Sequence, residues 1–168
     1  MIIREETAAD YDAVYELVGE AFAHAEHSDG TEQDLVARLR RSSAFIPQLS
    51  LVAQEGRTIV GHILFTQARI GSSKVLALAP LAVLPSYQRR GVGRALIRRG
   101  HDVARNLGFG YSVVLGDPRY YALSGYVKAQ DYGIFPPFDL LPEYYMCIRL
   151  RDDADPVGGT VEYAEEFF

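Results

Sequence analysis

The fold of this chain can be read outward from the stretch Leu81-Ala82-Val83-Leu84-Pro85-Ser86-Tyr87-Gln88-Arg89-Arg90-Gly91-Val92-Gly93-Arg94-Ala95-Leu96. Its first residues are apolar and typical of a buried strand, whereas apolar residues at helical spacing continue from Val92 to Leu107. The glycines between these two patterns indicate a turn from strand into helix. Gly108 follows the last apolar position and is expected to end the helix.

The turn has the features of an anion site. The first N–H groups of a helix have no partner within the helix and carry the positive end of its dipole, so they can donate to a phosphate. Gly91 and Gly93 allow close approach, and Arg89, Arg90 and Arg94 add positive charge. A second interpretation stays open at this point, in which the glycines only shape the connection and the arginines are solvated.

Two other phosphate-binding folds do not fit the turn. A dinucleotide-binding fold places a third glycine where Leu96 stands, and it lacks the antiparallel strands expected before this turn. A nucleoside triphosphate P-loop is excluded because no Gly-Lys-Ser or Gly-Lys-Thr occurs in the chain.

The segments before the turn predict a strand, two helices and a meander. Met1 to Arg4 is strand-like. Two capping patterns follow, Thr7 with Asp10 and Thr31 with Asp34, and each predicts the start of a helix. The first helix has apolar residues at helical spacing, namely Tyr11, Val14, Tyr15, Val18, Ala21 and Phe22. Three strand-like runs follow, at Leu49 to Gln54, Thr58 to Ile70 and Lys74 to Val83, and form an antiparallel meander.

The segments after the long helix are shorter. They predict a strand at Tyr111 to Leu115, a brief helix opened by Pro118 and closed by Gly125, and strands at Tyr126 to Ala129 and Glu143 to Leu150. The run Tyr132 to Phe138 is too rich in aromatic residues and prolines for regular structure, and is a packed loop, a lid or a dimer contact. Residues Arg151 to Phe168 form a tail without an assigned structure.

Composition and charge limit the class of protein. The chain has 168 residues, 48% hydrophobic and 23% charged, which predicts one domain over 1–168 with its core in 1–150. A net charge of -5 argues against a nucleic-acid partner. No apolar stretch reaches the roughly 18 residues of a spanning helix, and the N-terminus lacks the form of a signal peptide, so we expect a cytoplasmic protein without a membrane contact. The lone Cys147 is expected to be a buried structural thiol, and no metal site is indicated.

The sequence resembles the GNAT superfamily of N-acetyltransferases. The resemblance rests on Gln88-x-x-Gly91-x-Gly93 after Leu81-Ala82-Val83-x-Pro85, and on the order of elements from Ile2 to Leu150. Pro80-Leu81-Ala82-Val83 and Leu115-Gly116-Asp117-Pro118 further resemble a bacterial branch of these enzymes. The resemblance implies an α/β (α+β) domain whose mixed, mostly antiparallel sheet splays between Val83 and Tyr111 to Leu115, with helices on both faces. It also implies acetyl-CoA as co-substrate, an amine acceptor and a homodimer.

The resemblance assigns roles to particular residues. The backbone of Leu81, Ala82 and Val83 would pair with the pantetheine arm. The N–H groups that would hold the diphosphate are those of Gln88, Arg89, Arg90, Gly91, Val92, Gly93 and Arg94. Tyr121 would lie beside the cofactor sulfur and protonate the thiolate, because Tyr120-Tyr121-Ala122-Leu123-Ser124-Gly125-Tyr126 resembles the second motif of the family.

The general base has no obvious candidate. Some relatives carry a carboxylate on the strand that corresponds to Lys74 to Val83, and this chain has none there. Water or a residue near the first helical connection would have to serve, the titratable residues there being Glu20, His24, Glu26, His27, Asp29 and Glu32. His62 and His101 are weaker candidates. A module that binds or senses acyl-CoA without turnover is therefore the alternative function.

Overall fold

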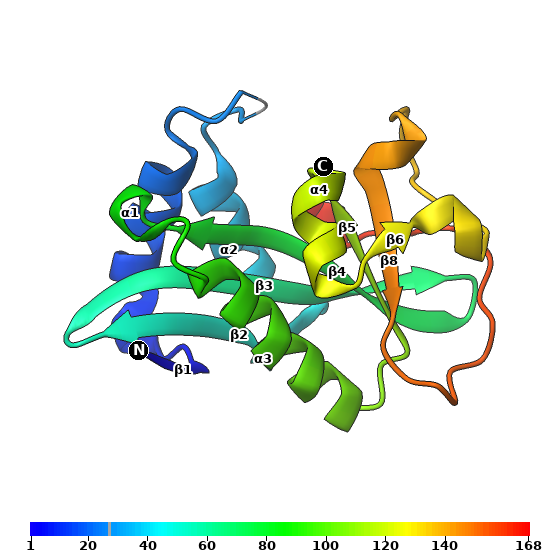
Figure 1. Cartoon of the computed structure of the whole chain (residues 1–168), viewed down its shortest axis with the longest axis horizontal. Coiled ribbons are helices and arrows are strands. Elements are labelled where there is room, and N and C mark those ends of the chain that lie inside the picture. The colour runs from blue at the N-terminus through cyan, green and yellow to red at the C-terminus, as the bar shows by residue number, and fades with distance from the viewer. Residues whose placement is uncertain (27) are drawn as a thin grey trace.

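Seven strands form one mixed sheet in the order β1-β2-β3-β4-β5-β8-β6 (Figure 1). This computed structural model describes residues 1–26 and 28–168. The strands of the sheet are β1 (Ile2–Glu5), β2 (Phe45–Glu55), β3 (Thr58–Ile70), β4 (Ser73–Val83), β5 (Tyr111–Leu115), β6 (Val127–Lys128) and β8 (Tyr145–Arg149). The α-helices are α1 (Tyr11–Phe22), α2 (Glu32–Arg40), α3 (Val92–Asn106) and α4 (Pro118–Tyr121).

The predicted meander forms the centre of the sheet. Strands β2, β3 and β4 pair antiparallel in succession, and glycines with positive φ, Gly56 and Gly71, stand in the two connecting turns. The first of these strands begins at Phe45, four positions before the predicted start at Leu49. The mixed, mostly antiparallel sheet and the helices on both of its faces confirm the expected fold class.

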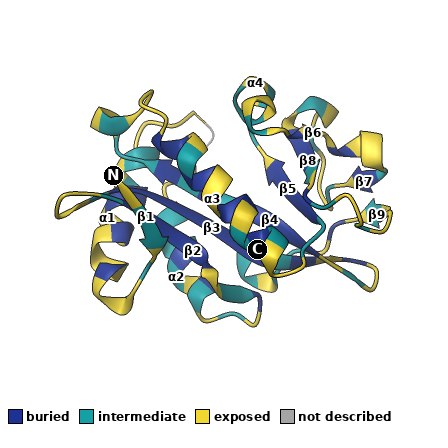
Figure 2. Ribbon diagram, turned by 60° about the horizontal axis from the view of Figure 1, so that its bottom comes forward, coloured by how far each residue is buried: buried dark blue, intermediate teal, exposed yellow. Residues whose placement is uncertain are grey.

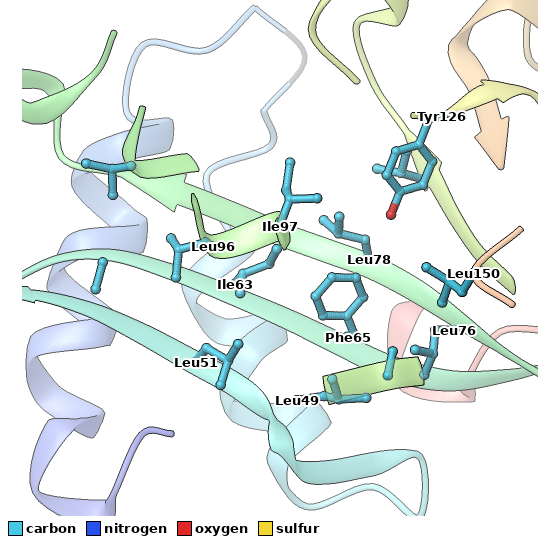
Figure 3. Close-up of a cluster of buried hydrophobic side chains, with 14 of the residues drawn as sticks. Leu49, Leu51, Ile63, Phe65, Leu76, Leu78, Leu96, Ile97, Tyr126 and Leu150 are labelled. Carbon is cyan, nitrogen blue, oxygen red and sulfur yellow. The ribbon is translucent and has the colours of Figure 1, made fainter. Parts of the chain in front are cut away.

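Alternation along β3 directs side chains to two separate cores. Ile63 and Phe65 pack with Leu96 of α3 in the cluster drawn in Figure 3, whereas Leu64 packs with Val18 of α1 and Val36 of α2. Successive side chains of a strand point to opposite faces, so α3 covers one face of the sheet while α1 and α2 cover the other. The two faces are buried at the centre of the sheet, as Figure 2 shows.

The sheet opens between β4 and β5. These strands are parallel and pair only at Leu76 with Ser112 and at Ala77 with Val113. Beyond Ala77 they diverge, and the part of β4 from 78 to 83 pairs with β3 alone within the described residues. A register shift of β4 against β3 lies next to Pro80. The predicted splay is therefore present, and proline stands where pairing is irregular.

The apolar face of the first helix differs from the predicted one. Val14, Leu17 and Val18 are buried, whereas Tyr11 and Tyr15 are 39% and 45% exposed. The Tyr11 ring lies under a guanidinium of α2, and the Tyr15 hydroxyl donates to a carboxylate of the same helix. Helical spacing alone does not distinguish a core position from one that flanks a neighbouring helix.

The two capping patterns have different outcomes. Thr7 and Asp10 form the reciprocal capping box, although the helix first makes a 3-10 turn before α1. Thr31 precedes α2 but makes no side-chain cap, because its hydroxyl donates to Asp29 at 2.6 Å and Asp34 accepts from Tyr15. The second helix is present where the sequence predicts it, but the capping box on which that prediction rests does not form.

The tail folds back onto the sheet. Gly159–Thr160 (β9) pairs in parallel with Ile134–Phe135 (β7), and Val161 is fully buried. The expectation of no regular structure from Tyr132 to Phe138 is thus wrong, because the tail supplies the partner strand that this short segment lacks locally. The predicted strand Tyr126 to Ala129 is reduced to Val127–Lys128.

Three further expectations concern single features. Cys147 is fully buried, and burial raises the pKa of its thiol to about 12, as expected of a structural thiol. Among the described residues, no group of three histidine, cysteine or acidic side chains is arranged to hold a metal ion. None of the helices described has the length and apolar character needed to cross a membrane.

Candidate functional site

A cavity of about 490 Å³ lies at the turn between β4 and α3. This volume is within the usual range of small-molecule sites. Its walls come from the end of β4, from the turn, from the first residues of α3 and from α4. The lining residues are Leu81, Val83, Tyr87, Gln88, Arg89, Gly91, Val92, Gly93, Arg94 and Tyr120.

The backbone of the turn presents a series of free donors. Within the described residues, the N–H groups from Arg89 to Arg94 donate to no acceptor, and the first bond of the helix runs from the Ala95 N–H to the Gly91 carbonyl at 3.0 Å. Arg89 and Gly91 have φ values of 63° and 82°. Left-handed residues in such a turn gather successive N–H groups into a concave anion-binding surface. The Gln88 N–H differs, because it donates to Pro85 at 3.3 Å.

The two glycines of the turn serve different purposes. A side chain at Gly91 would enter open space, but φ is positive there, so its backbone conformation favours glycine. Gly93 has an ordinary helical conformation, and a Cβ there would collide with the hydroxyl of Tyr120. Gly91 therefore shapes the donor surface, whereas Gly93 makes room for a cavity wall.

The positive charge around the cavity is not neutralised by carboxylates. Within the described residues, Arg89, Arg90 and Arg94 form no ion pair, and the guanidinium of Arg90 lies over the Tyr87 ring at 5.3 Å. Arg94 also lines a second cavity of about 200 Å³ with Arg98, one helical turn further along. Sequence reasoning missed Tyr87 and Arg98, although the spacing of four residues between Arg94 and Arg98 places them on one face of the helix.

The end of β4 contributes both side chains and backbone. Leu81 and Val83 line the cavity, whereas Ala82 points to the opposite face and packs beneath α1 and α2. Gln88 reaches back and donates its amide N–H to the Val83 carbonyl at 3.1 Å. Gln88 thus ties the turn to the strand, and Ala82, unlike its two neighbours, is not among the residues that line the cavity.

Tyr121 lies deeper than Tyr120. Its ring packs on Gly116 and meets the rings of Tyr120 and Tyr126 at 5.1 and 5.7 Å between centroids. Its hydroxyl has no hydrogen-bond partner in the part of the chain that the structure describes, and it does not line the cavity. Burial raises the pKa of Tyr121, and the neighbouring phenol of Tyr120 raises it further, so the hydroxyl keeps its proton at neutral pH.

The candidates for the general base do not converge on the cavity. Glu20, His24, Glu26 and Asp29 are exposed, and none of them lines it. Glu32 is half-buried, with one carboxylate oxygen that is buried and has no partner among the described residues. His27 lies outside the described residues.

Both further histidines are buried rather than exposed. The Nδ1 atom of His62 lies 2.9 Å from the Leu51 carbonyl, and the Nε2 atom of His101 lies 3.0 Å from the Tyr126 hydroxyl. Burial lowers the pKa of each imidazole to about 4, so both are neutral at pH 7. Neither histidine lines the cavity.

Comparison with known proteins shows the family of this chain. The sequence profile of the acetyltransferase (GNAT) family matches residues 11–132, which is more than half of the chain. The chain belongs to the GNAT family of acetyltransferases. The match spans the cavity turn and the Tyr120-Tyr121 pair, so both elements of this GNAT chain lie within the family domain.

Several relatives of this GNAT chain extend the comparison. The N-acetyltransferase YjhQ of Escherichia coli (strain K12) is 40% identical over 125 residues, which cover 71% of this chain and 69% of YjhQ. The N-acetyltransferase YhbS of the same strain is 30% identical over 170 residues, which cover 99% and 98% of the two chains.

Two solved structures share the fold over nearly the whole chain. The crystal structure of Escherichia coli YhbS in complex with CoA has a TM-score of 0.89 at 29% identity, covering 99% of this chain and 91% of that one. A GNAT family acetyltransferase from Brucella melitensis in complex with acetyl-CoA has a TM-score of 0.83 at 31% identity, covering 99% and 97%.

Proposed function

We propose that this GNAT chain transfers the acetyl group of acetyl-CoA directly to a primary amine. The observation that carries the proposal is the series of free N–H groups from Arg89 to Arg94, which lines a cavity beside the open edge of β4. A diphosphate needs such donors and positive charge, and an extended pantetheine arm needs an unpaired strand edge. The neighbours crystallised with CoA and acetyl-CoA support the same assignment.

The residues fit the parts of this co-substrate in order. The N–H groups of the turn and the arginines Arg89, Arg90 and Arg94 would bind the diphosphate. The edge of β4 at Leu81, Ala82 and Val83 would hold the pantetheine arm in the splay. These contacts would orient the thioester toward the amine. Orientation of the two reactants accounts for a large part of the rate acceleration in such a reaction.

The chemical step is proposed as follows. The unprotonated amine attacks the thioester carbonyl, a nitrogen–carbon bond forms, and the carbon–sulfur bond breaks with its electron pair going to sulfur. The Tyr121 hydroxyl donates a proton to this thiolate, and the proton that the amine nitrogen loses passes to water and restores Tyr121. A backbone N–H at the end of β4 near Val83 would stabilise the oxyanion.

The acceptor is proposed only by class. A net charge of -5 attracts a cationic amine in preference to an anionic one. Carboxylates close to the cavity that could act as the base are absent from its lining residues, so a water molecule is the proposed base. A cytoplasmic location and a homodimer stay predictions from the sequence.

Release of free thiol tests the proposal. The protein is incubated with acetyl-CoA and a panel of small amines, amino acids and peptides, and the thiol is measured with a chromogenic disulfide reagent. We expect thiol release that depends on at least one amine, with the acetylated amine seen by mass spectrometry. Tight binding of acetyl-CoA without amine-dependent release from any acceptor would favour the alternative, a module that senses acyl-CoA.

A further inference from the structure

Tyr126 lies directly behind Tyr121. The edge of one ring meets the face of the other at 78°, with 5.7 Å between centroids. Gly125, with a φ of 94°, ends the short helical segment after Tyr121 and turns the chain back toward the sheet. Tyr126 is therefore only 1% exposed, and its hydroxyl points into the core beside Leu78 (Figure 3).

The Tyr126 hydroxyl is held from two sides. The Nε2 atom of His101 on α3 lies 3.0 Å away, and the Oγ atom of Ser112 on β5 lies 2.9 Å away. His101 and Ser112 are buried as well. A phenol hydroxyl can donate one hydrogen bond and also accept one, so it donates to one neighbour and accepts from the other. A buried polar chain that is satisfied in this way holds its members rigidly.

His101 enters this chain as a neutral imidazole. Burial, together with the charge of Arg105, lowers its pKa to about 4, although the charge of Asp102 acts in the opposite direction. Its ring also packs at 6.0 Å from the Phe65 ring. The hydrogen-bonded chain therefore does not titrate in the neutral pH range.

The position of this chain links it to the site. Ser112 pairs with Leu76, one of the two residue pairs that join β4 to β5 before the sheet opens. His101 belongs to the helix that begins at the cavity turn. Tyr126 thus connects three elements, namely the helix behind the turn, the point where the sheet opens, and the segment that carries Tyr121.

We propose that Tyr126, held by His101 and Ser112, is a positioning residue that fixes the Tyr121 hydroxyl for proton transfer to the thiolate. The proposal rests on the proposed function of Tyr121. Tyr126 does not line the cavity and touches no reacting atom; it acts through the ring of Tyr121. Misplacement of a catalytic group by a fraction of its hydrogen-bond length slows the reaction, because the geometry of proton transfer is lost.

A double-mutant cycle separates positioning from simple packing. Tyr126→Phe keeps the ring and removes the hydroxyl, and Tyr121→Phe removes the proposed acid. We expect Tyr126→Phe to lower kcat by about tenfold, less than the roughly 10² to 10⁴ that general acid catalysis contributes, because the substitution displaces the proposed acid without removing it. The KM for acetyl-CoA should stay within about twofold of the wild type. In the Tyr121→Phe background the same substitution should have no further effect on kcat, since Tyr126 acts through Tyr121.

Tyr145→Phe is the matched control. Tyr145 is 2% exposed, and its hydroxyl lies 2.7 Å from that of Tyr163. Both residues pack in a core cluster with Val113 and Cys147, whereas Tyr126 packs in the cluster drawn in Figure 3. Like Tyr126→Phe, this control removes a hydrogen bond of a buried tyrosine hydroxyl. We therefore expect a comparable fall in Tm but an unchanged kcat. An equal fall of kcat for Tyr126→Phe in both backgrounds, or no fall in either, would overturn the positioning role.

A second measurement does not depend on turnover. In protein labelled with ¹³Cζ-tyrosine, the Tyr121 signal is the one missing from Tyr121→Phe. We expect it to shift or broaden in Tyr126→Phe and to stay unchanged in Tyr145→Phe. If no amine supports thiol release, the proposed function fails, but the Tyr121 signal still tests whether Tyr126 positions Tyr121. A Tyr121 signal that is unchanged in Tyr126→Phe would overturn the positioning role.

Discussion

Two regions of the molecule are rich in arginine, and they use it in opposite ways. At the corner between β1 and α2, Arg40 meets Glu6 through two hydrogen bonds of 2.8 and 2.9 Å, and the two side chains are 11% and 3% exposed. At the cavity turn, Arg89 and Arg90 are exposed and form no ion pair among the described residues. Charges satisfied inside the fold stabilise it, whereas charges left unpaired beside free N–H groups are available to a ligand.

The electrostatics of the corner show how complete its pairing is. Burial by itself would raise the pKa of Glu6, but the hydrogen bonds from Arg40 and Ser50, with the charges nearby, lower it. The Ser50 hydroxyl donates to the same carboxylate at 2.6 Å. Among the described residues no carboxylate pairs with the arginines of the turn, so their charge is expected to weaken the fold slightly and to strengthen anion binding.

The largest expected effect is the loss of cofactor binding on substitution of Gly91. We expect Gly91→Glu to abolish acetyl-CoA binding, because a carboxylate would enter the space where the diphosphate approaches the free N–H groups. Isothermal titration calorimetry measures the affinity, and circular dichroism verifies the fold. Gly56→Glu is the matched control, since Gly56 also has positive φ and open space but lies in the hairpin between β2 and β3. Unchanged affinity in Gly91→Glu would remove the case for the cavity as the cofactor site.

Removal of Arg40 tests the other side of the contrast. Arg40→Met leaves the Glu6 carboxylate buried without its partner, which costs about 3 to 5 kcal/mol of unfolding free energy in comparable buried pairs. Urea denaturation measures this loss. Arg90→Met should change the unfolding free energy by only about 0.5 kcal/mol, because its guanidinium is solvated. Equal losses for the two variants would contradict the distinction between paired and unpaired arginines.

Substitution of Tyr121 tests whether its hydroxyl is the proposed proton donor. Tyr121→Phe keeps the ring packing, so acetyl-CoA binding should survive while kcat falls by about 10² to 10⁴, with the lower end favoured because coenzyme A thiolate is a good leaving group. Steady-state kinetics with an acceptor found in the thiol-release assay measures the effect. Tyr15→Phe, which removes an exposed hydroxyl on α1, should leave kcat unchanged. A loss of tenfold or less would demote Tyr121 to a packing residue.

The arginines of the turn should have a smaller, ligand-dependent effect. Arg89→Ala and Arg90→Ala each remove one charged donor, so we expect coenzyme A to bind about tenfold more weakly, consistent with the loss of one charge-assisted hydrogen bond. A pantetheine fragment without the nucleotide presents no diphosphate, and its affinity should stay within about twofold. Calorimetry with both ligands gives the comparison, and equal losses would argue against phosphate recognition by these side chains.

The smallest expected effect is the pH dependence of a second ion pair, between Arg4 of β1 and Asp10 before α1. Hydrogen bonds from Arg4 and Thr7 lower the pKa of Asp10 to about 2, outweighing its burial. Because the folded pKa lies below the unfolded value, the stabilisation is complete above about pH 4 and is lost as the pH falls toward about 2. Asp10→Asn should thus lower the unfolding free energy by about 1 kcal/mol at pH 7, and the difference from the wild type should shrink below pH 4.

A matched control accompanies this pH experiment. Asp102 pairs with Arg105 at 3.2 Å, but the two side chains are 58% and 41% exposed. Asp102→Asn should change the unfolding free energy little at any pH, because exposed ion pairs contribute little. A difference for Asp10→Asn that did not depend on pH between 2 and 7 would show that the Asp10 carboxylate acts by packing alone.

The sequence by itself determined the order of the elements and the place of the turn between β4 and α3. The strand-like run from Thr58 to Ile70, the helical spacing from Val92 and the turn at Gly91 are local signals, because each arises from the backbone geometry of neighbouring residues. The same signals locate the long helix and the meander, whereas the Tyr120-Tyr121 pair is singled out only by the resemblance to GNAT enzymes.

The tertiary structure alone decided which residues meet across the fold. The parallel pairing of β7 with β9, the role of Gly93 in making room for Tyr120, and the chain from His101 through Tyr126 to Ser112 all join residues far apart in sequence. A single sequence carries no signal for such contacts, because they depend on how whole elements pack rather than on local backbone preference. The physical reason is the same for the tail, whose strand exists only where another strand lies beside it.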